Sequence, residues 1–426
     1  MNLFGFAKKD ITPEIGCLLY GYVDDLKSES IHDRLNINTF YFGSDTDEAF
    51  MITAEVCSIN TAFSEKMRKE IAAATSVPYK NIILHAIHNH TGPNTDGNTG
   101  WGPLDKDYCE NILLPAAISA ANEAKMNATK AYVGINIGNS DVAVNRREQD
   151  SENHLIFGQC EWGCYDPRMA VFSFKDESEK ILASMIYYTC HGTCAGKNTA
   201  ISRDWAGGMI DALEEHTGAP AAFFCGPEGD VGPRLRNGQT VGNMDDVEYM
   251  GALAGNDAIK IFDGIKDYKP LEFKLIASEI SIPLKPRISF EDAMEKFMEF
   301  RHFSVNLEGQ IRDYSERVLR SYEEGYTEEK TRTTPQTLIS ICGNIFISFP
   351  FELFSEIALR INKAKSGYEV FSLSNTNGSE GYFPTHSEIS KGGYEIDMFL
   401  TANVQPYADN ADWHLIKETL RNLEEY

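Results

Sequence analysis

The sequence predicts an α/β protein in which mixed β-sheets are flanked by helices. Strand-like and helix-like segments alternate along the whole chain, and several pairs of strands are joined by short turns. Such hairpins indicate sheets with antiparallel neighbours, not an all-parallel, doubly wound sheet. The motifs G-x-G-x-x-G and G-x4-G-K-[ST] are absent from the sequence, which removes the common nucleotide-binding fingerprints.

Apolar patterns define the elements of the first half of the chain. Apolar runs predict strands at residues 38–44, 49–56, 80–88, 130–138, 169–176, 180–190 and 220–226. The first two of these strands form a hairpin around residues 45–48, and the strands at 169–176 and 180–190 form another. Helical spacing predicts helices at residues 63–76, 103–127 and 204–218. Pro115 is expected to kink the second helix, and Gly218 closes the third.

The second half continues in the same way. Helices are expected at residues 246–265, 290–302, 307–325, 352–365 and 411–426. Strands are expected at residues 271–284, 337–350 and 369–375, the middle one being a hairpin that turns at Gly343-Asn344. The chain has no repeat period and no low-complexity linker, so we expect one domain over residues 1–426.

Composition limits the classes of function. The 426 residues carry a formal net charge of −24, which argues against binding to a nucleic-acid backbone or to an anionic membrane surface. The N-terminus does not resemble a signal peptide, and no apolar run is long enough for stable insertion into a membrane. We therefore expect a cytoplasmic location with nine reduced cysteines. Their C-x3-C spacings do not match the usual zinc motifs.

Three histidines lie close together in residues 85–93, HAIHNHTGP. In an extended segment, residues two positions apart face the same way, so His88 and His90 should project together and His85 to the opposite side. A pair of this kind can present two imidazoles to a metal ion or a substrate. The spacing is equally consistent with one histidine that caps the turn and one that lies in solvent.

Further candidates follow other predicted strands. They are His191, which enters a loop of small residues; the glycine-rich loop 225–238; Glu352, which follows Phe-Pro; and the glycine-flanked Tyr382 and Tyr394. Each has an ordinary structural alternative: a core histidine, a surface loop, a glutamate at a helix N-terminus or a tyrosine packed in a turn. Taken together, two histidines and a carboxylate from separate strand ends can hold Zn²⁺ and leave one position for water.

Seven short motifs occur in the order seen in one enzyme family. They are DITPEIGCLLYGY (10–22), HNHTGP (88–93), VNRR (144–147), YTCHGTC with SRDWAGG (188–208), GDVGPR (229–234), FPFE (349–352) and GYFPT with GGYE (381–395). In these motifs the chain resembles the catalytic domain of the neutral/alkaline non-lysosomal ceramidases. The resemblance implies the fold of that catalytic domain, with site segments at residues 85–93, 188–205, 225–238, 346–356 and 377–395.

The resemblance also implies roles for individual residues. The zinc ligands of the family correspond to His88, His191, Glu352 and Tyr382. His90, Arg146 and Tyr394 correspond to active-site positions that contact the substrate amide and the developing oxyanion. Asp230 and Gly232 correspond to the loop that positions the substrate.

Two departures from the family pattern affect the expected chemistry. The family has a serine, proposed as nucleophile or as a substrate-positioning group, where this chain has Gly232. Attack by water activated by the metal is then expected, with Glu352 or a neighbour as the proton relay. Cys225 is a conceivable substitute, although a buried, inert cysteine is the favoured interpretation. The secreted ceramidases also carry a C-terminal immunoglobulin-like domain, whereas this chain ends in an expected helix.

The sequence thus predicts a zinc-dependent hydrolase of a linear amide with one catalytic ion. Its substrate is expected to be a small-molecule or lipid-like N-acyl compound other than ceramide itself. A metal-retaining binding protein without catalysis, or a metal-dependent esterase, is the alternative.

Overall fold

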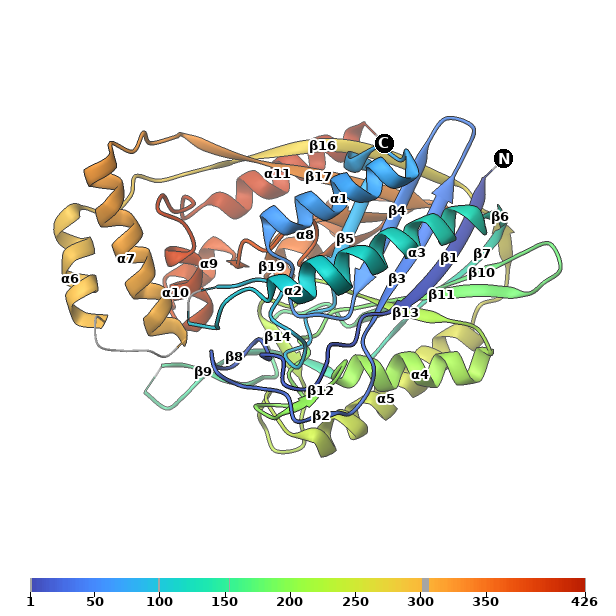
Figure 1. Cartoon of the computed structure of the whole chain (residues 1–426), viewed down its shortest axis with the longest axis horizontal. Helices are drawn as coiled ribbons and strands as arrows, with labels where there is room; N and C mark the ends of the chain where they lie inside the picture. The colour runs from blue at the N-terminus through green and yellow to red at the C-terminus, as the bar shows by residue number, and fades with distance from the viewer. Residues whose placement is uncertain (1, 99, 153, 301–305, 426) are drawn as a thin grey trace.

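Three β-sheets form the centre of the molecule, and helices cover them on the outside (Figure 1). The computed structural model describes residues 2–98, 100–152, 154–300 and 306–425. The predicted fold class, mixed sheets flanked by helices, is confirmed. The last two residues of the helix predicted at 290–302 lie outside the described residues.

The first sheet contains the N-terminal strands. Its order is β5-β4-β3-β1-β6, formed by β5 (Ile82–Ala86), β4 (Glu48–Ala54), β3 (Asn36–Gly43), β1 (Leu3–Asp10) and β6 (Thr129–Lys130). β4 and β5 are parallel, whereas β3 pairs antiparallel with both β1 and β4. Helices α1 (Thr61–Thr75) and α3 (Leu114–Met126) share an apolar cluster with this sheet. These helices cover one face of β3 and β4, and a second apolar cluster, shared with the other two sheets, covers the opposite face. This explains why their residues are almost continuously apolar and buried.

The second sheet has the order β13-β11-β10-β7-β15. Its strands are β13 (Ala221–Cys225), β11 (Ile181–Tyr188), β10 (Arg168–Lys175), β7 (Tyr132–Asn139) and β15 (Tyr268–Pro270). β11 and β13 are parallel, and β10 and β11 form the predicted hairpin. Helices α4 (Trp205–Thr217) and α5 (Met244–Asp263) cover its outer face, on the opposite side of the molecule from α1 and α3 (Figure 1).

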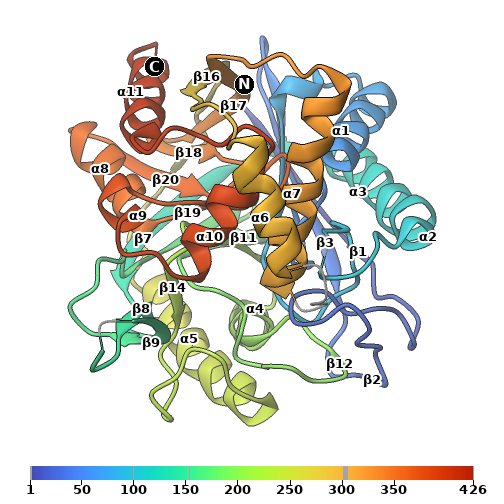
Figure 2. The same cartoon turned by 90° about the vertical axis from the view of Figure 1, so that its left-hand side faces the viewer.

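The third sheet has the order β16-β17-β18-β20. Its strands are β16 (Phe273–Pro283), β17 (Thr331–Ile341), β18 (Asn344–Ser348) and β20 (Glu369–Leu373), and β18 and β20 are parallel. Helices α8 (Ser355–Ala364) and α11 (Ala411–Glu424) lie on its outer side (Figure 2). The hairpin between β17 and β18 turns at Cys342 and Gly343, one residue earlier than predicted, because these two residues adopt the left-handed conformation with φ of 48° and 85°.

An aromatic-rich core joins the three sheets. Phe4 of the first sheet stacks on Phe174 of the second with ring centroids 4.1 Å apart. Phe172 of the second sheet contacts Phe346 and Phe371 of the third. Burial of large rings between sheets is the main stabilising contribution expected for such a core. The shared core supports the proposal that the chain folds as one domain.

Smaller elements surround the site. They are the sheet β14 (Val231–Pro233)-β8 (Ala143–Gln149)-β9 (Leu155–Cys160), the pairs β2 (Ser30–Ile31)-β12 (Ala200–Ile201) and β19 (Glu352–Leu353)-β21 (Tyr382–Phe383), and the helices α6 (Phe290–Phe300), α7 (Asn306–Glu324), α9 (His386–Ile389) and α10 (Tyr394–Thr401). The hairpin of β8 and β9 was not predicted, because its strands are polar and short.

Two predicted helices differ from the structure in an informative way. The helix predicted at 103–127 begins at α2 (Lys106–Tyr108) and passes through a π-helical turn (Cys109–Leu113) directly before α3. This turn accommodates Pro115, which has no N–H to donate, so the expected irregularity takes the form of a π-turn. The helix predicted from residue 352 instead begins at Ser355, and Glu352 lies in β19.

Among the described helices, none is long and apolar enough to cross a membrane.

Candidate metal centre and active site

The functional residues gather where parallel strands of all three sheets end. His88 and His90 follow β5, His191 follows β11, and Glu352 follows β18. Two bridges hold these strand ends together: Asn89 pairs with Gly192 beyond β11, and His85 pairs with Thr376 beyond β20. Polar groups that leave the carboxyl ends of neighbouring parallel strands meet at one edge, which is where α/β proteins commonly bind ligands.

Three side chains converge at the centre of this edge. The Nε2 atoms of His88 and His191 lie 3.1 Å apart. Each of these nitrogens lies 3.3 Å from Oε2 of Glu352. These three residues form a group whose potential ligand atoms all lie within 4.8 Å of one another. The structure therefore brings together three of the four predicted ligands. Two of them, His88 and Glu352, are more than 250 residues apart in the sequence.

Backbone carbonyls determine which imidazole nitrogens are free. Nδ1 of His88 lies 3.0 Å from the carbonyl oxygen of Cys57, and Nδ1 of His191 lies 2.7 Å from that of Glu228. A carbonyl oxygen can only accept, so both Nδ1 atoms carry a proton, and Nε2 is the atom of each ring that can offer a lone pair to a cation. Metal-bound histidines characteristically have this arrangement, because the hydrogen bond at the far nitrogen orients the ring.

The geometry and the donor set fit a divalent cation. A tetrahedral site with bonds of about 2.0 Å has ligand-to-ligand edges of about 3.3 Å, which matches the 3.1 to 3.3 Å separations of the three donor atoms. Oε2 of Glu352 is buried and receives no hydrogen bond from the described residues. A buried carboxylate oxygen without a donor is costly unless a positive charge faces it.

Electrostatics at the centre are consistent with this fit. Burial lowers the pKa of His191 to about 3, with Arg146 and His88 adding to the effect, so this imidazole is neutral at pH 7. Burial alone would raise the pKa of Glu352, but the two imidazoles hold it well below its usual value. The centre thus presents an ionised carboxylate and a neutral His191, the states that a cation requires. Burial disfavours the charged form of His88, but Cys57 and Glu352 raise its pKa well above the usual value, so a cation would take the place of the proton on its Nε2.

His90 lies beside the first three residues but in a second group. Its Nε2 is 3.2 Å from Nε2 of His88, and it forms a potential ligand group with Cys57 and His88, not with Glu352. Its Nδ1 lies 3.2 Å from the carbonyl oxygen of Gly21. A Cβ atom at Gly21, where φ is +124°, would lie only 2.5 Å from this Nδ1, so only glycine allows the ring to sit here. The Gly-Tyr motif near the N-terminus therefore supports His90 directly.

The backbone that orients His88 and His90 is not the extended strand assumed from the sequence. β5 ends at Ala86, and His88 has a left-handed conformation with φ of 67°. The two rings still meet, but through a bend instead of strand alternation. His85 does lie on the strand, where its Nδ1 is 2.9 Å from Oγ1 of Thr53 and its Nε2 accepts the N–H of Cys225 at 3.1 Å. The structural role predicted for His85 is confirmed.

Tyr382 is placed beside Glu352 by strand register. β19 and β21 pair in parallel with Glu352 opposite Tyr382, so both side chains leave the same face. Nη2 of Arg146 donates to the Tyr382 hydroxyl at 2.9 Å, and the Arg146 Nε donates to Oε1 of Glu395 at 2.9 Å. The ring of Tyr394 lies 5.8 Å from that of Tyr382. The structure thus brings these predicted residues together, whereas their assigned roles stay predictions.

Asp230 and Gly232 are placed differently. Neither is among the described residues that line the cavity at the imidazoles. Oδ1 of Asp230 accepts the N–H and the hydroxyl of Ser355, at 2.8 and 2.7 Å. A Cβ atom at Gly232 would lie 2.7 Å from Cβ of Thr240, so the side chain of Thr240 fills the space next to this glycine.

Several residues of the site were not predicted from the sequence. Glu228 is buried, its carbonyl binds His191, and its Oε1 accepts the side-chain amide of Asn375 at 2.6 Å. Glu395 joins Arg146 to Arg147, whose Nη1 donates to it at 2.7 Å. Glu228 lies within the glycine-rich loop and Glu395 directly after Tyr394, so their proximity to predicted residues was the only available signal.

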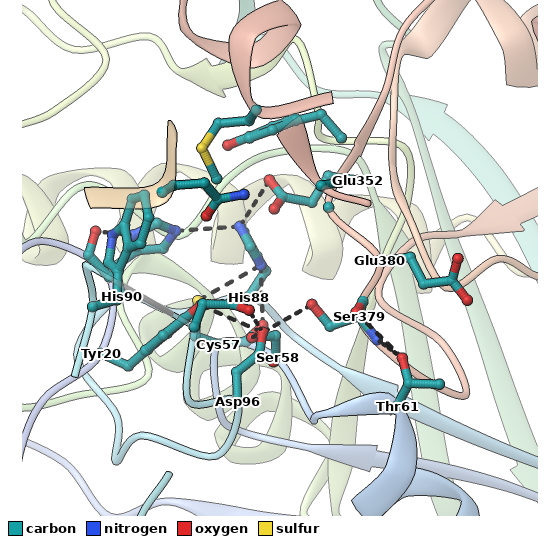
Figure 3. A pocket seen from close by; sticks show the side chains of 18 of the residues that line it. Tyr20, Cys57, Ser58, Thr61, His88, His90, Asp96, Glu352, Ser379 and Glu380 are labelled. Atoms are coloured by element: carbon teal, nitrogen blue, oxygen red, sulfur yellow. Dashed lines mark hydrogen bonds and ion pairs between the residues drawn. The ribbon is translucent and has the colours of Figure 1, made fainter. Parts of the chain in front are cut away.

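A cavity of about 410 Å³ opens from the centre. Figure 3 shows His88 and Glu352 at one side of it, next to His90, with Asp96, Ser58 and Ser379 at another. Tyr382 and Tyr394 also line it. A substrate in this cavity would therefore contact the histidines, the glutamate and both tyrosines.

Comparison with known proteins identifies the family. The family model for the N-terminal part of neutral/alkaline non-lysosomal ceramidases matches residues 2–248. The chain belongs to this family. Membership of the ceramidase family implies an amidohydrolase, and the resemblance inferred from the seven motifs is confirmed. A comparison with curated proteins gives no match.

Two solved ceramidase structures share the fold. Neutral ceramidase from Pseudomonas aeruginosa is 16% identical with a TM-score of 0.74, over 99% of this chain and 73% of that chain. A ceramidase complexed with C2 is 16% identical with a TM-score of 0.71, over 99% of this chain and 74% of that chain. At this identity the match establishes the fold of the ceramidase catalytic domain, as predicted.

Proposed function

We propose that the protein is a metal-dependent hydrolase of a linear amide, and that zinc is its ion. One observation carries the proposal: two imidazole Nε2 atoms and a buried, donor-free carboxylate oxygen converge within 3.3 Å at the end of a cavity. His88, His191 and Glu352 would hold the ion, with Tyr382 as the fourth ligand. When bound, such an ion polarises a carbonyl group and lowers the pKa of water toward about 7.

The remaining residues orient the substrate and handle protons. His90 points a lone pair on Nε2 toward the centre, because its Nδ1 proton is held by the Gly21 carbonyl. It is therefore placed to accept a proton from an attacking water. Arg146 is fixed by Glu395 and faces Tyr382, so its positive charge stabilises negative charge that develops on the amide oxygen. The hydroxyl of Tyr394 is the second donor that we assign to this oxygen.

Water is the nucleophile that the site supports best. Gly232 offers no nucleophilic atom. Cys225 is fully buried, and burial raises the pKa of its thiol well above the usual value, with Glu228 adding to the effect. Only the thiolate is an effective nucleophile, so Cys225 is inert. No acyl-enzyme intermediate should therefore accumulate during turnover.

The test combines metal analysis with an amide panel. The purified protein is stripped with a chelator, reconstituted with Zn²⁺ or other divalent ions, and assayed on N-acyl amides and matched esters. We expect about one ion per chain, amide hydrolysis that is lost on stripping and restored by the ion, and no covalent acyl adduct by mass spectrometry. Amide hydrolysis that survives complete removal of the metal would refute the proposal.

The same experiment separates the alternatives. Bound metal without hydrolysis of any amide or ester would indicate a binding protein, the interpretation motivated by the glycine at position 232. Ester hydrolysis without amide hydrolysis would indicate an esterase.

A further inference from the structure

The walls of the cavity contain very little aliphatic surface. Among the described residues that line it, only Met398 and Ala402 have aliphatic side chains, and both lie on or after α10. The rest are the histidines and Glu352, aromatic residues, glycines, Cys57 and residues with hydroxyl, amide or charged groups. A long acyl chain packed against such walls would leave hydroxyl, amide and carboxylate groups without hydrogen-bond partners, which costs free energy.

Asp96 is the central polar group of the wall. Its side chain is buried, with 4% of the residue exposed. Its Oδ2 accepts hydrogen bonds from Ser58 Oγ at 2.7 Å, Ser379 Oγ at 2.9 Å and Asn98 Nδ2 at 3.0 Å. The hydroxyl of Tyr20 lies 3.4 Å from the same oxygen. Residues from four separate segments thus hold this carboxylate in one position.

The second carboxylate oxygen of Asp96, Oδ1, can accept a hydrogen bond from a ligand. No described residue donates a hydrogen bond to Oδ1, although Asp96 lines the cavity. A fixed carboxylate oxygen at a cavity wall requires a donor, and a ligand that cannot supply one leaves it unpaired at considerable cost. Asp96 therefore selects for a hydrogen-bond donor on the ligand.

The surroundings favour a hydroxyl group as this donor. Ser58, Ser379 and Asn98 line the same wall, and each of these groups can both donate and accept. A hydroxyl can exchange hydrogen bonds with them while it donates to Asp96. The cavity also contains Arg332, which faces Glu380 at 4.0 Å, so a monoacetylated diamine is used to test for a cationic ligand.

We propose that the substrate is the N-acyl derivative of a small, hydroxylated amine, with a hydroxyl group of the amine part bound to Asp96. This inference rests on the proposed amide hydrolysis and specifies its substrate class. The acyl group is short, because a long hydrocarbon chain would cover the polar groups of this cavity without offering them hydrogen bonds.

The test uses substrates of similar size that differ in their hydroxyl groups. N-acetylglucosamine is compared with N-acetylcyclohexylamine, a short-chain ceramide and a monoacetylated diamine, with the protein loaded with Zn²⁺. For the wild type we expect kcat/KM to favour N-acetylglucosamine over N-acetylcyclohexylamine by about 100-fold, since a hydrogen bond to a buried charge is at stake. Preference for the ceramide or for the diamine would overturn the proposal.

Two variants test the role of Asp96. Asp96→Asn should lower kcat/KM for N-acetylglucosamine by about 100-fold, mainly through KM, and leave N-acetylcyclohexylamine nearly unchanged. Ser58→Ala, which removes one donor to the carboxylate and is less disruptive to folding, should give a smaller loss with the same selectivity. Asp105→Asn, at the N-cap of α2 and outside the cavity lining, is the matched control and should not change the ratio. Equal losses for both substrates would contradict the assignment.

Binding measurements separate this inference from the proposed function. If no amide is hydrolysed, the proposed activity fails, and ligand-observed NMR then tests Asp96 directly. Binding of N-acetylglucosamine to the wild type and its loss in Asp96→Asn would support the inference. Equal or absent binding in both proteins would overturn it.

Discussion

Two regions of the molecule carry motifs of the ceramidase family, yet they serve the site in different ways. At the imidazole centre, the side chains of His88, His191 and Glu352 converge on one another, and His88 and Glu352 line the cavity. In the loop 226–233, Asp230 and Gly232 point elsewhere, toward Ser355 and Thr240.

The loop holds in place the segments that the centre uses. The carbonyl of Asp230 accepts the N–H of Arg146 at 2.8 Å, and the carbonyl of Val231 accepts the N–H of His191 at 3.1 Å. The carboxylate of Asp230 binds Ser355, at the start of the helix that follows Glu352. A shared motif can therefore indicate a positioning role as well as a contact with the substrate, and sequence order alone does not distinguish the two.

The largest effect should follow from removal of a ligand. His191→Ala should lose the bound metal and reduce kcat by at least about 1,000-fold, because the ion and the preorganised centre are lost together. The matched control is His85→Gln, another buried histidine that is not in the ligand group, which should retain one ion per chain and lose only stability. Metal content by mass spectrometry and unfolding by denaturant check both variants. Full metal content in His191→Ala would show that this histidine is not a ligand of the ion.

Loss of the Asp230 carboxylate should mainly affect stability. Asp230→Ala leaves the N–H and hydroxyl of Ser355 and the amide of Asn145 without their buried acceptor. We expect the free energy of unfolding to fall by about 3 kcal/mol, with metal still bound below the transition. Urea unfolding with and without the ion measures this. If metal is lost while stability is unchanged, Asp230 belongs to the centre after all.

Introducing the family serine at position 232 should not increase the rate of amide hydrolysis. Gly232→Ser places Cβ 2.7 Å from Cβ of Thr240 and should cost about 2 kcal/mol through overpacking, without a gain in kcat. Combining it with Thr240→Gly should recover part of this loss, and a double-mutant cycle measures the coupling. A more active Gly232→Ser enzyme, or trapping of an acyl-serine in it, would show that the loop faces the substrate.

The last effect concerns pH and is small for each pH unit. Burial raises the pKa of Asp230 from 3.8 to about 7. In the pH range between these values the folded state binds a proton more tightly than the unfolded state, so the contribution of this group to stability falls as pH rises. An asparagine at this position does not titrate. In Asp230→Asn the free energy of unfolding should therefore fall less steeply as pH rises, by about 1 kcal/mol for each pH unit in that range. Parallel pH profiles of the variant and the wild type would contradict the shift.

Local sequence patterns were sufficient for many features. Apolar periodicity predicted most strands and helices, and glycine and proline marked their ends, because these signals act over a few residues. Two histidines and a carboxylate after apolar strands predicted a metal site at the strand ends. The resemblance assigned His88 as the ligand and His90 as a substrate contact, and added Tyr382, which general ligand chemistry would not have selected.

Only the tertiary structure decided how these segments meet. Strand register places Glu352 beside Tyr382, and an ion pair joins Arg146 to Glu395. Asp96 accepts a hydrogen bond from Ser379, 283 residues later in the chain. The carbonyls that fix the imidazole protons also come from distant loops. Such contacts depend on packing of three sheets around one core, and no short stretch of sequence encodes them. The sequence by itself therefore indicated the histidines and the carboxylate of the centre, because they follow apolar strands. The fold decided which further residues join them and what each one contacts, because those contacts form between distant segments.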